Sequence, residues 1–509
     1  MNRGKQLLSG VLFILLLSSA FSQEGFGQAR MMSGVNLGMA GAGAAKPGGI
    51  SSMYINPSMT AVDMDQRRYG FSLAGFGFST GGALVNVDAY NRHFTTGQFL
   101  GEAEIDHALT DFFGPDDLSM KNGAASIQSM PIGLAYRYDD MYFTLGSRVS
   151  SHSKAGFNRG MMELMLTGFD SNYFGNGKPV NTSTQNVTYS DITAGFNRKW
   201  LEIENSGWVQ SHQLYGGVAV GYVMGHHYAE FDLNSNLTIE GDERIIHEFD
   251  YVIQTTGPET QALADYSQEL SDNGFTSDFG AHYGDPLDDG ITRGSGWHTQ
   301  LGATWHMDVE PISDGSFFGS GDHHLNISAS VTDIGQISFS ENSGTYKGSD
   351  TVVWEGIEGD LEYIDENYDD FEDYFTTVLE DSILTNQYLA YNLDDDGDHV
   401  VGLPTQFNFG SYYRMGRLGV ATDLGFGLVE RGMNTSNAHF SAGAHYDIVD
   451  LIPVRTGVRF GGKTSTSYSA GIGLKTSVFN FEVSVMAVEN SGSGGTHLAA
   501  GFGGLNFRF

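Results

Sequence analysis

The 509-residue sequence contains no cysteine, only 10 prolines, and only 26 lysines and arginines against 61 aspartates and glutamates. Without cysteine, the chain must be held by burial and backbone hydrogen bonds rather than by disulfides. The formal net charge of −35 would be repelled by a phosphate backbone, which argues against nucleic acid as a partner. Low proline together with 34 phenylalanines and 24 tyrosines argues against disorder.

Long apolar runs are absent except at the start of the chain. Arg3 and Lys5 precede the apolar run 7–17, and small residues follow up to Ser22. This order is typical of a cleaved secretory signal peptide, here predicted over residues 1–22. No later run reaches the roughly 20 apolar residues of a membrane-spanning helix, so any membrane span of the exported chain would be made of strands.

Glycine is abundant, with 69 residues, and it follows a pattern of period two. In "RLGVATDLGFGLV", Val420 and Leu424 share an apolar face, whereas Gly419 and Asp423 lie on the other face. The stretches "VRTGVRFGG", "SYSAGIGLK" and "FNFEVSVMA" alternate in the same way. Charge and glycine on a common face suit a water-filled or plugged lumen with lipid outside.

Counting such segments predicts an all-β fold, a transmembrane antiparallel β-barrel of about fourteen strands over residues 65–509. Residues 23–64 are predicted to form an N-terminal plug, with a flexible periplasmic terminus as the alternative. Long outward loops containing some helix are expected near 94–128, 241–294 and 340–402. The strands expected before residue 340 are Tyr69–Ser79, Ala83–Tyr90, Pro131–Tyr138, Tyr142–Ser150, Asp191–Trp200, Gln213–Met224, His298–His306 and His324–Thr332.

The stretch "SGVNLGMAGAGAAKPGGISSMYINPSMT" is rich in glycine and alanine and leads to Asn56-Pro57-Ser58 before the first strand. It resembles the N-terminal segment of the FadL-like outer-membrane long-chain fatty-acid transporters and of the related PorV-type barrels, where an Asn-Pro-Ala motif lies inside the barrel. Ser58 departs from that motif. The segments "VTDIGQISF", "GLPTQFNFGSYY" and "SAGIGLK" resemble most closely a branch of that group with a domain of unknown function.

The resemblance implies a bacterial outer-membrane protein, in contact with outer-membrane lipid, that takes up hydrophobic or amphiphilic small molecules passively. The alternative is a non-enzymatic PorV-like barrel that docks a secreted or surface protein. A third possibility is a barrel-anchored surface module that binds calcium or polysaccharide. No Gly-x-Ser-x-Gly, His-Glu-x-x-His or phosphate-binding loop occurs, so the chain is predicted not to be an enzyme.

Two sets of residues are candidate binding sites. Arg455 and Arg459 are expected to face the lumen, where they could meet the carboxylate of an amphiphile or pair with Asp423 or Glu482. The stretch "NLDDDGDH" places oxygen ligands at alternate positions before a glycine, as in the first half of a calcium loop. Leu403 stands where the final glutamate would be, so a solvated acidic loop is the alternative to Ca²⁺, and no other cofactor is expected. The candidate calcium ligands are Asn392, Asp394, Asp396 and Asp398.

The last residues, "GGLNFRF", place Leu505, Phe507 and Phe509 on one face of a strand. An aromatic residue at the end of the last strand is expected to be an assembly signal for the barrel-assembly machinery. Leu498 and Phe502 lie in the opposite phase, so Gly503-Gly504 is predicted to form a bulge or a change of face. The last uniformly lipid-facing run is therefore expected to be only residues 505–509.

Overall fold

The structure is a computed structural model, and it describes residues 33–509 with gaps at 65–66, 98–99, 116–117, 205–206, 242–243, 274–291, 311–322, 355–391, 396, 430–433, 435, 463–465 and 489–495. The predicted signal peptide, 1–22, and the first part of the predicted plug, 23–32, lie outside the described residues. No helix in the described part of the chain is long and apolar enough to cross a membrane.

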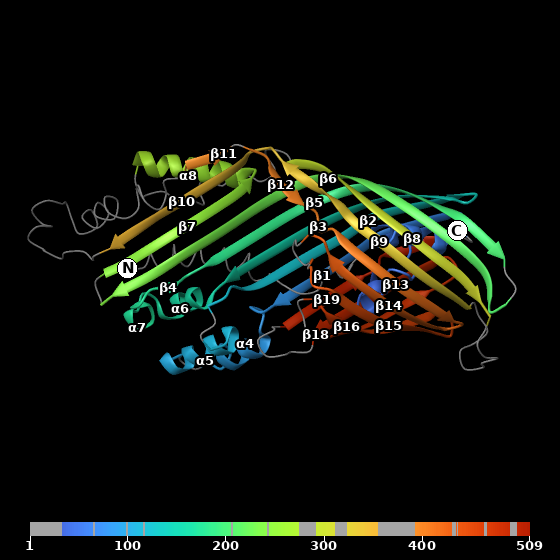
Figure 1. The fold of residues 1–509 in the computed structure, drawn as a ribbon, viewed down its shortest axis with the longest axis horizontal. Helices are drawn as coiled ribbons and strands as arrows, with labels where there is room; N and C mark the ends of the chain where they lie inside the picture. Colours follow the sequence, from blue (N-terminus) through green and yellow to red (C-terminus); the bar gives the residue numbers. More distant parts are fainter. Residues whose placement is uncertain are drawn as a thin grey trace, which may run out of the picture.

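The described strands form one sheet that closes on itself (Figure 1). β1 (Tyr69–Gly82) pairs with β2 (Lys121–Tyr138) on one side and with β19 (Thr496–Phe502) and β20 (Leu505–Arg508) on the other. The result is a closed antiparallel barrel of 14 strands, which confirms the predicted fold class. The remaining wall strands are β3 (Met141–Phe157), β5 (Thr182–Glu204), β6 (Val209–Glu240), β8 (Gly294–Val309), β9 (His323–Phe339), β13 (Gln406–Met415), β14 (Leu418–Gly427), β15 (His439–Ile448), β16 (Ile452–Gly461), β17 (Ser467–Lys475) and β18 (Phe479–Val488).

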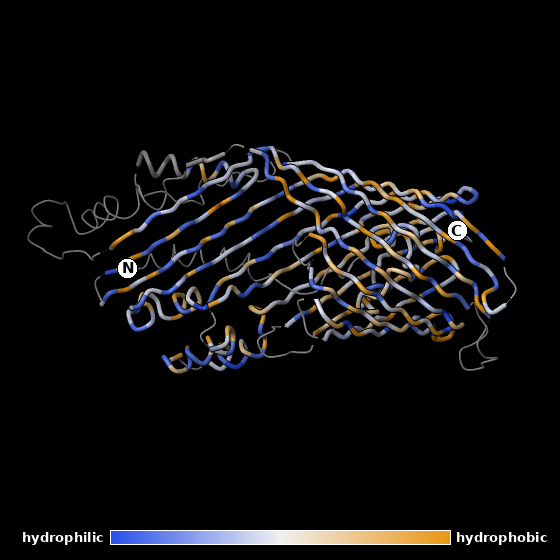
Figure 2. The backbone as a smooth tube through the Cα atoms, viewed as in Figure 1, coloured by the Kyte–Doolittle hydropathy of each residue, from blue (hydrophilic) through white to orange (hydrophobic). Residues whose placement is uncertain are grey.

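The two faces of the wall differ as the period-two pattern predicts. Along β14, Val420 and Leu424 are exposed, whereas Gly419, Ala421 and Asp423 are buried. Colouring by hydropathy shows the same alternation along the wall strands (Figure 2). An outward face of large apolar side chains around a closed barrel is the arrangement that lipid requires.

Part of the sheet projects beyond the closed wall. β6 pairs with β8 only as far as Gly225, and from Ala229 onward its neighbour on that side is β7 (Arg244–Thr256). β7 in turn pairs with β10 (Ser343–Trp354), and β10 pairs with the short β11 (Asn392–Asp395). At about 3.3 Å per residue, the 32 residues of β6 extend for roughly 100 Å, far more than a bilayer needs.

These strands correct the loop predictions. Residues 244–256 and 343–354 are strands rather than loop, and 121–128 belong to β2. The helix expected in the second loop is present as α8 (Pro258–Asn273). The prediction failed because residues such as "RIIHEFDYVI" alternate like wall strands but lie in acidic surroundings that favoured a loop assignment. Two further short strands, β4 (Lys178–Pro179) and β12 (His399–Gly402), pair with β6 and β9.

Besides α8, four helices accompany the projecting strands at one end of the barrel (Figure 1). They are α4 (Val87–His93), α5 (Glu102–Phe113), α6 (Arg159–Thr167) and α7 (Ser171–Phe174). The expected strand over Ala83–Tyr90 is therefore wrong. The Asn86 side chain accepts a hydrogen bond from the Ala89 amide and so starts α4 there, because an N-terminal cap satisfies an otherwise unpaired helix amide.

The predicted irregularity at Gly503-Gly504 is a bulge between β19 and β20. Gly504 has φ +77°, and β1 changes partner from Phe502 to Leu505 across this point. The bulge shifts the alternation of the two faces by one residue. Before the bulge the even-numbered Leu498 faces outward and is 47% exposed, whereas after the bulge the even-numbered Asn506 is buried. The apolar outward face therefore continues through the bulge, instead of being confined to residues 505–509.

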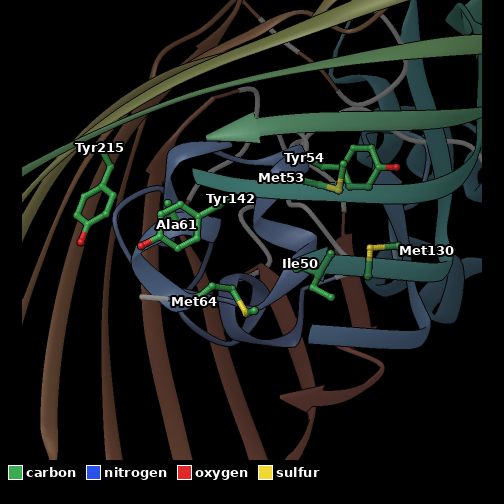
Figure 3. Packing of buried hydrophobic residues seen from close by; sticks show 9 residues of the cluster. Ile50, Met53, Tyr54, Ala61, Met64, Met130, Tyr142 and Tyr215 are labelled. Atoms are coloured by element: carbon green, nitrogen blue, oxygen red, sulfur yellow. The ribbon is translucent and has the colours of Figure 1, made fainter. Parts of the chain in front are cut away.

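Residues 33–64 lie inside the barrel as α2 (Gly34–Gly38), the 3₁₀ helix η1 (Ile50–Tyr54) and α3 (Ser58–Met64). They contact strands from both halves of the wall, β16 to β19 through α2 and β3 to β8 through α3. Ile50, Met53 and Tyr54 pack with Met130 and other wall residues in a fully buried cluster (Figure 3). This segment is named the plug below.

Candidate functional site

The plug is joined to the wall by polar side chains on the lumen face. Short serine and asparagine side chains donate hydrogen bonds to plug carbonyls. Such bonds remove the cost of burying backbone polar groups away from water. They are Ser330 to Ile55 (2.8 Å), Asn326 to Ala45 (2.9 Å), Ser441 to Ala40 (2.8 Å), Ser469 to Gly38 (3.0 Å) and Ser484 to Gly34 (2.6 Å).

Asp423 of the wall accepts hydrogen bonds from backbone amides of the plug. Its Oδ2 atom accepts hydrogen bonds from the backbone amides of Gly43, at 2.9 Å, and Ala44, at 2.7 Å. Bonds from two amides to one carboxylate are charge-assisted and short. The lumen-facing aspartate of β14 is therefore a clamp on the plug.

The Asn56-Pro57-Ser58 turn is also docked on the wall. Asn56 Nδ2 donates to the Ala44 carbonyl, at 3.0 Å, and to Thr304 Oγ1, at 3.2 Å. Its Oδ1 accepts a hydrogen bond from the Ser58 hydroxyl, at 2.7 Å, and Ser58 Oγ lies 2.7 Å from Thr304 Oγ1. An alanine in place of Ser58 would keep the turn but lose the contact with Thr304.

Glycines on the lumen face allow this close approach. A Cβ atom on Gly302 would lie 2.0 Å from Asn56 Oδ1, and one on Gly217 would lie 2.7 Å from the Ser58 amide nitrogen. On the opposite wall, a Cβ atom on Gly457 would lie 2.4 Å from the carbonyl carbon of Met39. Gly217, Gly302 and Gly457 thus lie where the plug approaches the wall closely.

Arg455 and Arg459 are both buried on the lumen side of β16. Arg455 Nη2 donates to Glu482 Oε1 at 2.6 Å, so the pairing with Glu482 that the sequence left open is present. Arg459 lies against the plug, 3.6 Å from the position of a Cβ atom on Gly41. Both arginines therefore belong to the contact between plug and wall.

A charged cluster that the sequence did not predict lies beside the plug. The guanidinium of Arg148 donates to Asp191 Oδ2 at 2.7 Å and to both carboxylate oxygens of Asp333 at 2.7 and 3.2 Å. His298 Nε2 lies 3.5 Å from Asp191 Oδ1, and all four side chains are at most 2% exposed. We call these four residues the lumen charge cluster.

The plug takes part in this cluster through Tyr54. The Tyr54 hydroxyl donates to Asp191 Oδ1 at 3.1 Å, and the Arg148 guanidinium lies 4.7 Å from the centre of the Tyr54 ring. Asp333 reaches the cluster at a break in β9, where the residue has φ +54° and β9 changes partner from β13 to β12. The four side chains come from four strands, β3, β5, β8 and β9, so the strand pattern alone could not place them together.

A layer of apolar side chains follows the lumen charge cluster on the side of the projecting strands. Along β5, Tyr189 and Val187 follow Asp191 on the lumen face, and along β9, Ile337 and Phe339 follow Asp333. They belong to one buried cluster, named here the apolar layer, whose members are Val187, Tyr189, Val223, Tyr228, Ile337, Phe339, Val401 and Leu403. The lumen is therefore ordered along its axis as apolar layer, charge cluster and plug.

In the part of the chain that the structure describes, the proposed calcium ligands do not form one site. Asn392 lies in β11 and Asp394 in the same short strand, whereas Asp396 falls outside the described residues. Asp398 is exposed and accepts a hydrogen bond from Ser338 Oγ at 2.8 Å. Across the described part of the chain, no group of three or more histidine, aspartate or glutamate side chains is placed to hold a metal ion. Calcium binding stays a prediction.

A closed antiparallel barrel with an apolar outward face and a plugged lumen defines a protein of the outer-membrane β-barrel class. The chain belongs to a family of unknown function, DUF5723, whose model matches residues 72–507. This agrees with the predicted branch that carries a domain of unknown function. No curated protein matches the sequence.

Several solved outer-membrane proteins are similar to the chain at low sequence identity. The toluene transporter TodX of Pseudomonas putida aligns over 96% of this chain and 99% of its own, with 10% identity and a TM-score of 0.43. A FadL homologue of Pseudomonas aeruginosa aligns over 96% and 99%, with 13% identity and a TM-score of 0.39. The translocator domain of the autotransporter NalP of Neisseria meningitidis aligns over 88% and 92%, with 8% identity and a TM-score of 0.31. FadL-type barrels are thus among the structures that the chain is similar to, as the sequence resemblance predicted.

Proposed function

We propose that the protein admits hydrophobic or amphiphilic small molecules passively through the outer membrane, after cleavage of the signal peptide over residues 1–22. The observation that carries the proposal is the order of the lumen along β5 and β9. A molecule entering from the side of the projecting strands meets the apolar layer, then the lumen charge cluster, then the plug. Apolar walls favour an apolar solute, and the charges beyond them favour a polar head.

Passage requires the plug to shift, because its residues fill the lumen between both halves of the wall. The contacts that hold it are hydrogen bonds, close packing and the ion pair of Asp63 with Arg508, with no covalent link in a chain without cysteine. Each such bond is worth only about 1 kcal/mol net, so the plug can rearrange without unfolding the barrel. No chemical step is part of this function.

The absence of native cysteine permits a direct test of plug movement. The Ile50 Cβ atom lies 3.5 Å from the position of a Cβ atom on Gly133 of β2, so Ile50→Cys with Gly133→Cys can be joined by a disulfide. Gly70→Cys with Ala135→Cys, at 3.4 Å, joins β1 to β2 within the wall and is the matched control. Uptake of radiolabelled octanoate and naphthalene is measured in cells before and after oxidation.

Oxidation is expected to abolish uptake for the pair that joins plug to wall and to leave it unchanged for the pair within the wall. Reduction should restore it. Equal uptake by the oxidised and reduced forms of the first pair would refute passage past a moving plug.

A second function is favoured by a different observation, the sheet formed by β6, β7 and β10 beyond the closed wall. We propose as the alternative that this projecting sheet docks another protein at the cell surface. Purification from outer membrane, followed by mass spectrometry of bound lipids and proteins, separates the two. Bound amphiphiles would support uptake, whereas a stoichiometric protein partner that is lost when β7 and β10 are each replaced by a separate short turn would support docking.

A further inference from the structure

A polar cavity of about 350 Å³ lies between the plug and the wall at the end of the barrel that carries the short turns. Its rim includes Gly416 and Arg417 between β13 and β14, Asp450 between β15 and β16, and Lys475 at the end of β17. This is the end opposite to the projecting strands (Figure 1). The cavity belongs neither to the apolar layer nor to the lumen charge cluster.

The cavity is cationic in a strongly acidic protein. Of the 26 lysines and arginines of the chain, six line it, whereas only four of the 61 aspartates and glutamates do. The six are Lys46, Arg414, Arg417, Arg455, Lys475 and Arg508, and the four are Asp63, Asp447, Asp450 and Glu482. A concave site with an excess of positive charge attracts anions.

Each of the four carboxylates already has a guanidinium partner. Asp63 pairs with Arg508 at 2.9 Å and Glu482 with Arg455 at 2.6 Å. Two more pairs complete the set, Asp447 with Arg414 at 2.7 Å and Asp450 with Arg417 at 2.8 Å. Lys475, at 3.3 Å, shares Asp447.

Among the six basic residues of the cavity, Lys46 is the one without a carboxylate partner in the described part of the chain. The residue is 8% exposed, its ammonium makes one hydrogen bond, to the Pro47 carbonyl at 3.4 Å, and it lies 5.7 Å from the centre of the Tyr412 ring. No ion pair joins it to a carboxylate among the described residues. Burial, with Arg455 nearby, lowers the pKa of Lys46 to about 7, because an unpaired ammonium is costly away from water.

Arg455, another residue of the cavity lining, carries unsatisfied donors. Its Nε and Nη1 atoms are buried and have no hydrogen-bond partner among the described residues, while Nη2 is engaged by Glu482. A buried guanidinium with two unused N–H groups, in the same cavity lining as an ammonium without a carboxylate partner, matches an acceptor with two oxygens.

We propose that this cavity binds a small oxyanion, a carboxylate or a phosphate, between Lys46 of the plug and Arg455 of β16. The anion bridges the plug to the wall, so occupancy of the site stabilises the closed position of the plug. The proposal does not depend on uptake, since binding is an equilibrium property of the closed barrel.

The test is equilibrium dialysis of the full chain in detergent micelles at pH 6.5 and low salt, with radiolabelled inorganic phosphate and radiolabelled octanoate as separate probes. The variant is Lys46→Met, and the matched control is Lys347→Met, an exposed position in β10 far from the cavity. Heat-modifiable migration on gels verifies that each variant is folded.

The Lys46→Met change is expected to weaken binding by about tenfold or more, the usual effect of removing a charged hydrogen-bond donor, and Lys347→Met to leave it unchanged. Binding of phosphate identifies a free anion as occupant, and binding of octanoate alone identifies the head group of an amphiphile. The proposal is overturned if neither probe binds, or if the folded Lys46→Met protein binds both as tightly as the wild type.

Discussion

Asn56 occupies the space in front of Gly302, with its Oδ1 atom 2.0 Å from the position of a Cβ atom on that glycine. The side chain of Asn56 in the plug therefore contacts the backbone of β8 at Gly302, and any side chain at position 302 must displace the turn. Asn56 is fully buried and also bonds the Ala44 carbonyl, so a displaced turn would loosen two parts of the plug.

The first prediction is that Gly302→Val opens the barrel without preventing its assembly. The valine side chain would collide with Asn56 and Pro57, whereas the wall strand itself keeps its backbone bonds. Planar-bilayer recordings should show a higher single-channel conductance than for the wild type. Ala303→Val is the control, because Ala303 is exposed on the outer face of β8. Wild-type conductance of Gly302→Val would contradict the role of this contact.

The second prediction concerns the lumen charge cluster. Arg148→Met leaves Asp191 and Asp333 buried without their cation, which is expected to lower the free energy of unfolding by about 3–5 kcal/mol. Urea titration followed by gel migration measures this change. Arg244→Met is the control, since Arg244 pairs with Glu240 where both side chains are at least 42% exposed, and a loss of about 0–1 kcal/mol is expected. Equal midpoints for the two variants would refute a structural role of the cluster.

The third prediction concerns the bulge between β19 and β20. Gly504 has φ +77°, and a Cβ atom there would lie 2.6 Å from the Leu73 carbonyl oxygen of β1. Gly504→Val is therefore expected to disrupt the pairing that closes the barrel and to lower the fraction of folded protein in the outer membrane several-fold. Gly503→Ala, where the nearest atom would lie at 3.1 Å, should be affected much less. The folded fraction is measured in membrane extracts by heat-modifiable migration.

The fourth prediction separates two roles of Phe509. Its carbonyl oxygen accepts hydrogen bonds from the Arg68 and Tyr69 amides, at 2.8 and 3.0 Å, and its amide donates to the Tyr69 carbonyl at 2.9 Å. Deletion of Phe509 removes this closure of the barrel and is expected to impair assembly.

Phe509→Leu keeps the backbone bonds but removes the aromatic ring, which is 62% exposed. Impaired assembly of the deletion alone would assign the effect to barrel closure, and impairment of both variants would assign it to recognition of the aromatic residue. Normal membrane levels of the deletion variant would contradict both roles.

Much of the barrel could be predicted from particular residues. Val420 and Leu424 against Gly419 and Asp423 determined both faces of β14, because side chains alternate strictly along a strand. The change of phase near Gly503-Gly504 indicated the bulge for the same reason. The site was predicted only in part. Arg455 and Arg459 lie on one strand, so its alternation was enough to predict the face of each. Arg148 shares its strand with none of its partners, so no pattern within one strand could predict the cluster.

The sequence by itself thus determined the class of fold, the faces of the C-terminal strands and the buried N-terminal segment, because these depend on local periodicity and composition. Only the tertiary structure decided which lumen residues meet, since Arg148, Asp191, His298 and Asp333 lie on four strands brought together by closure of the sheet. The tertiary structure also decided that β6, β7 and β10 form a sheet beyond the closed wall. The sequence could not show this, because a strand in lipid and a strand in a projecting sheet have the same alternation of side chains. The surplus charge of Lys46 emerged in the same way, as it depends on how all the carboxylates around one cavity are paired.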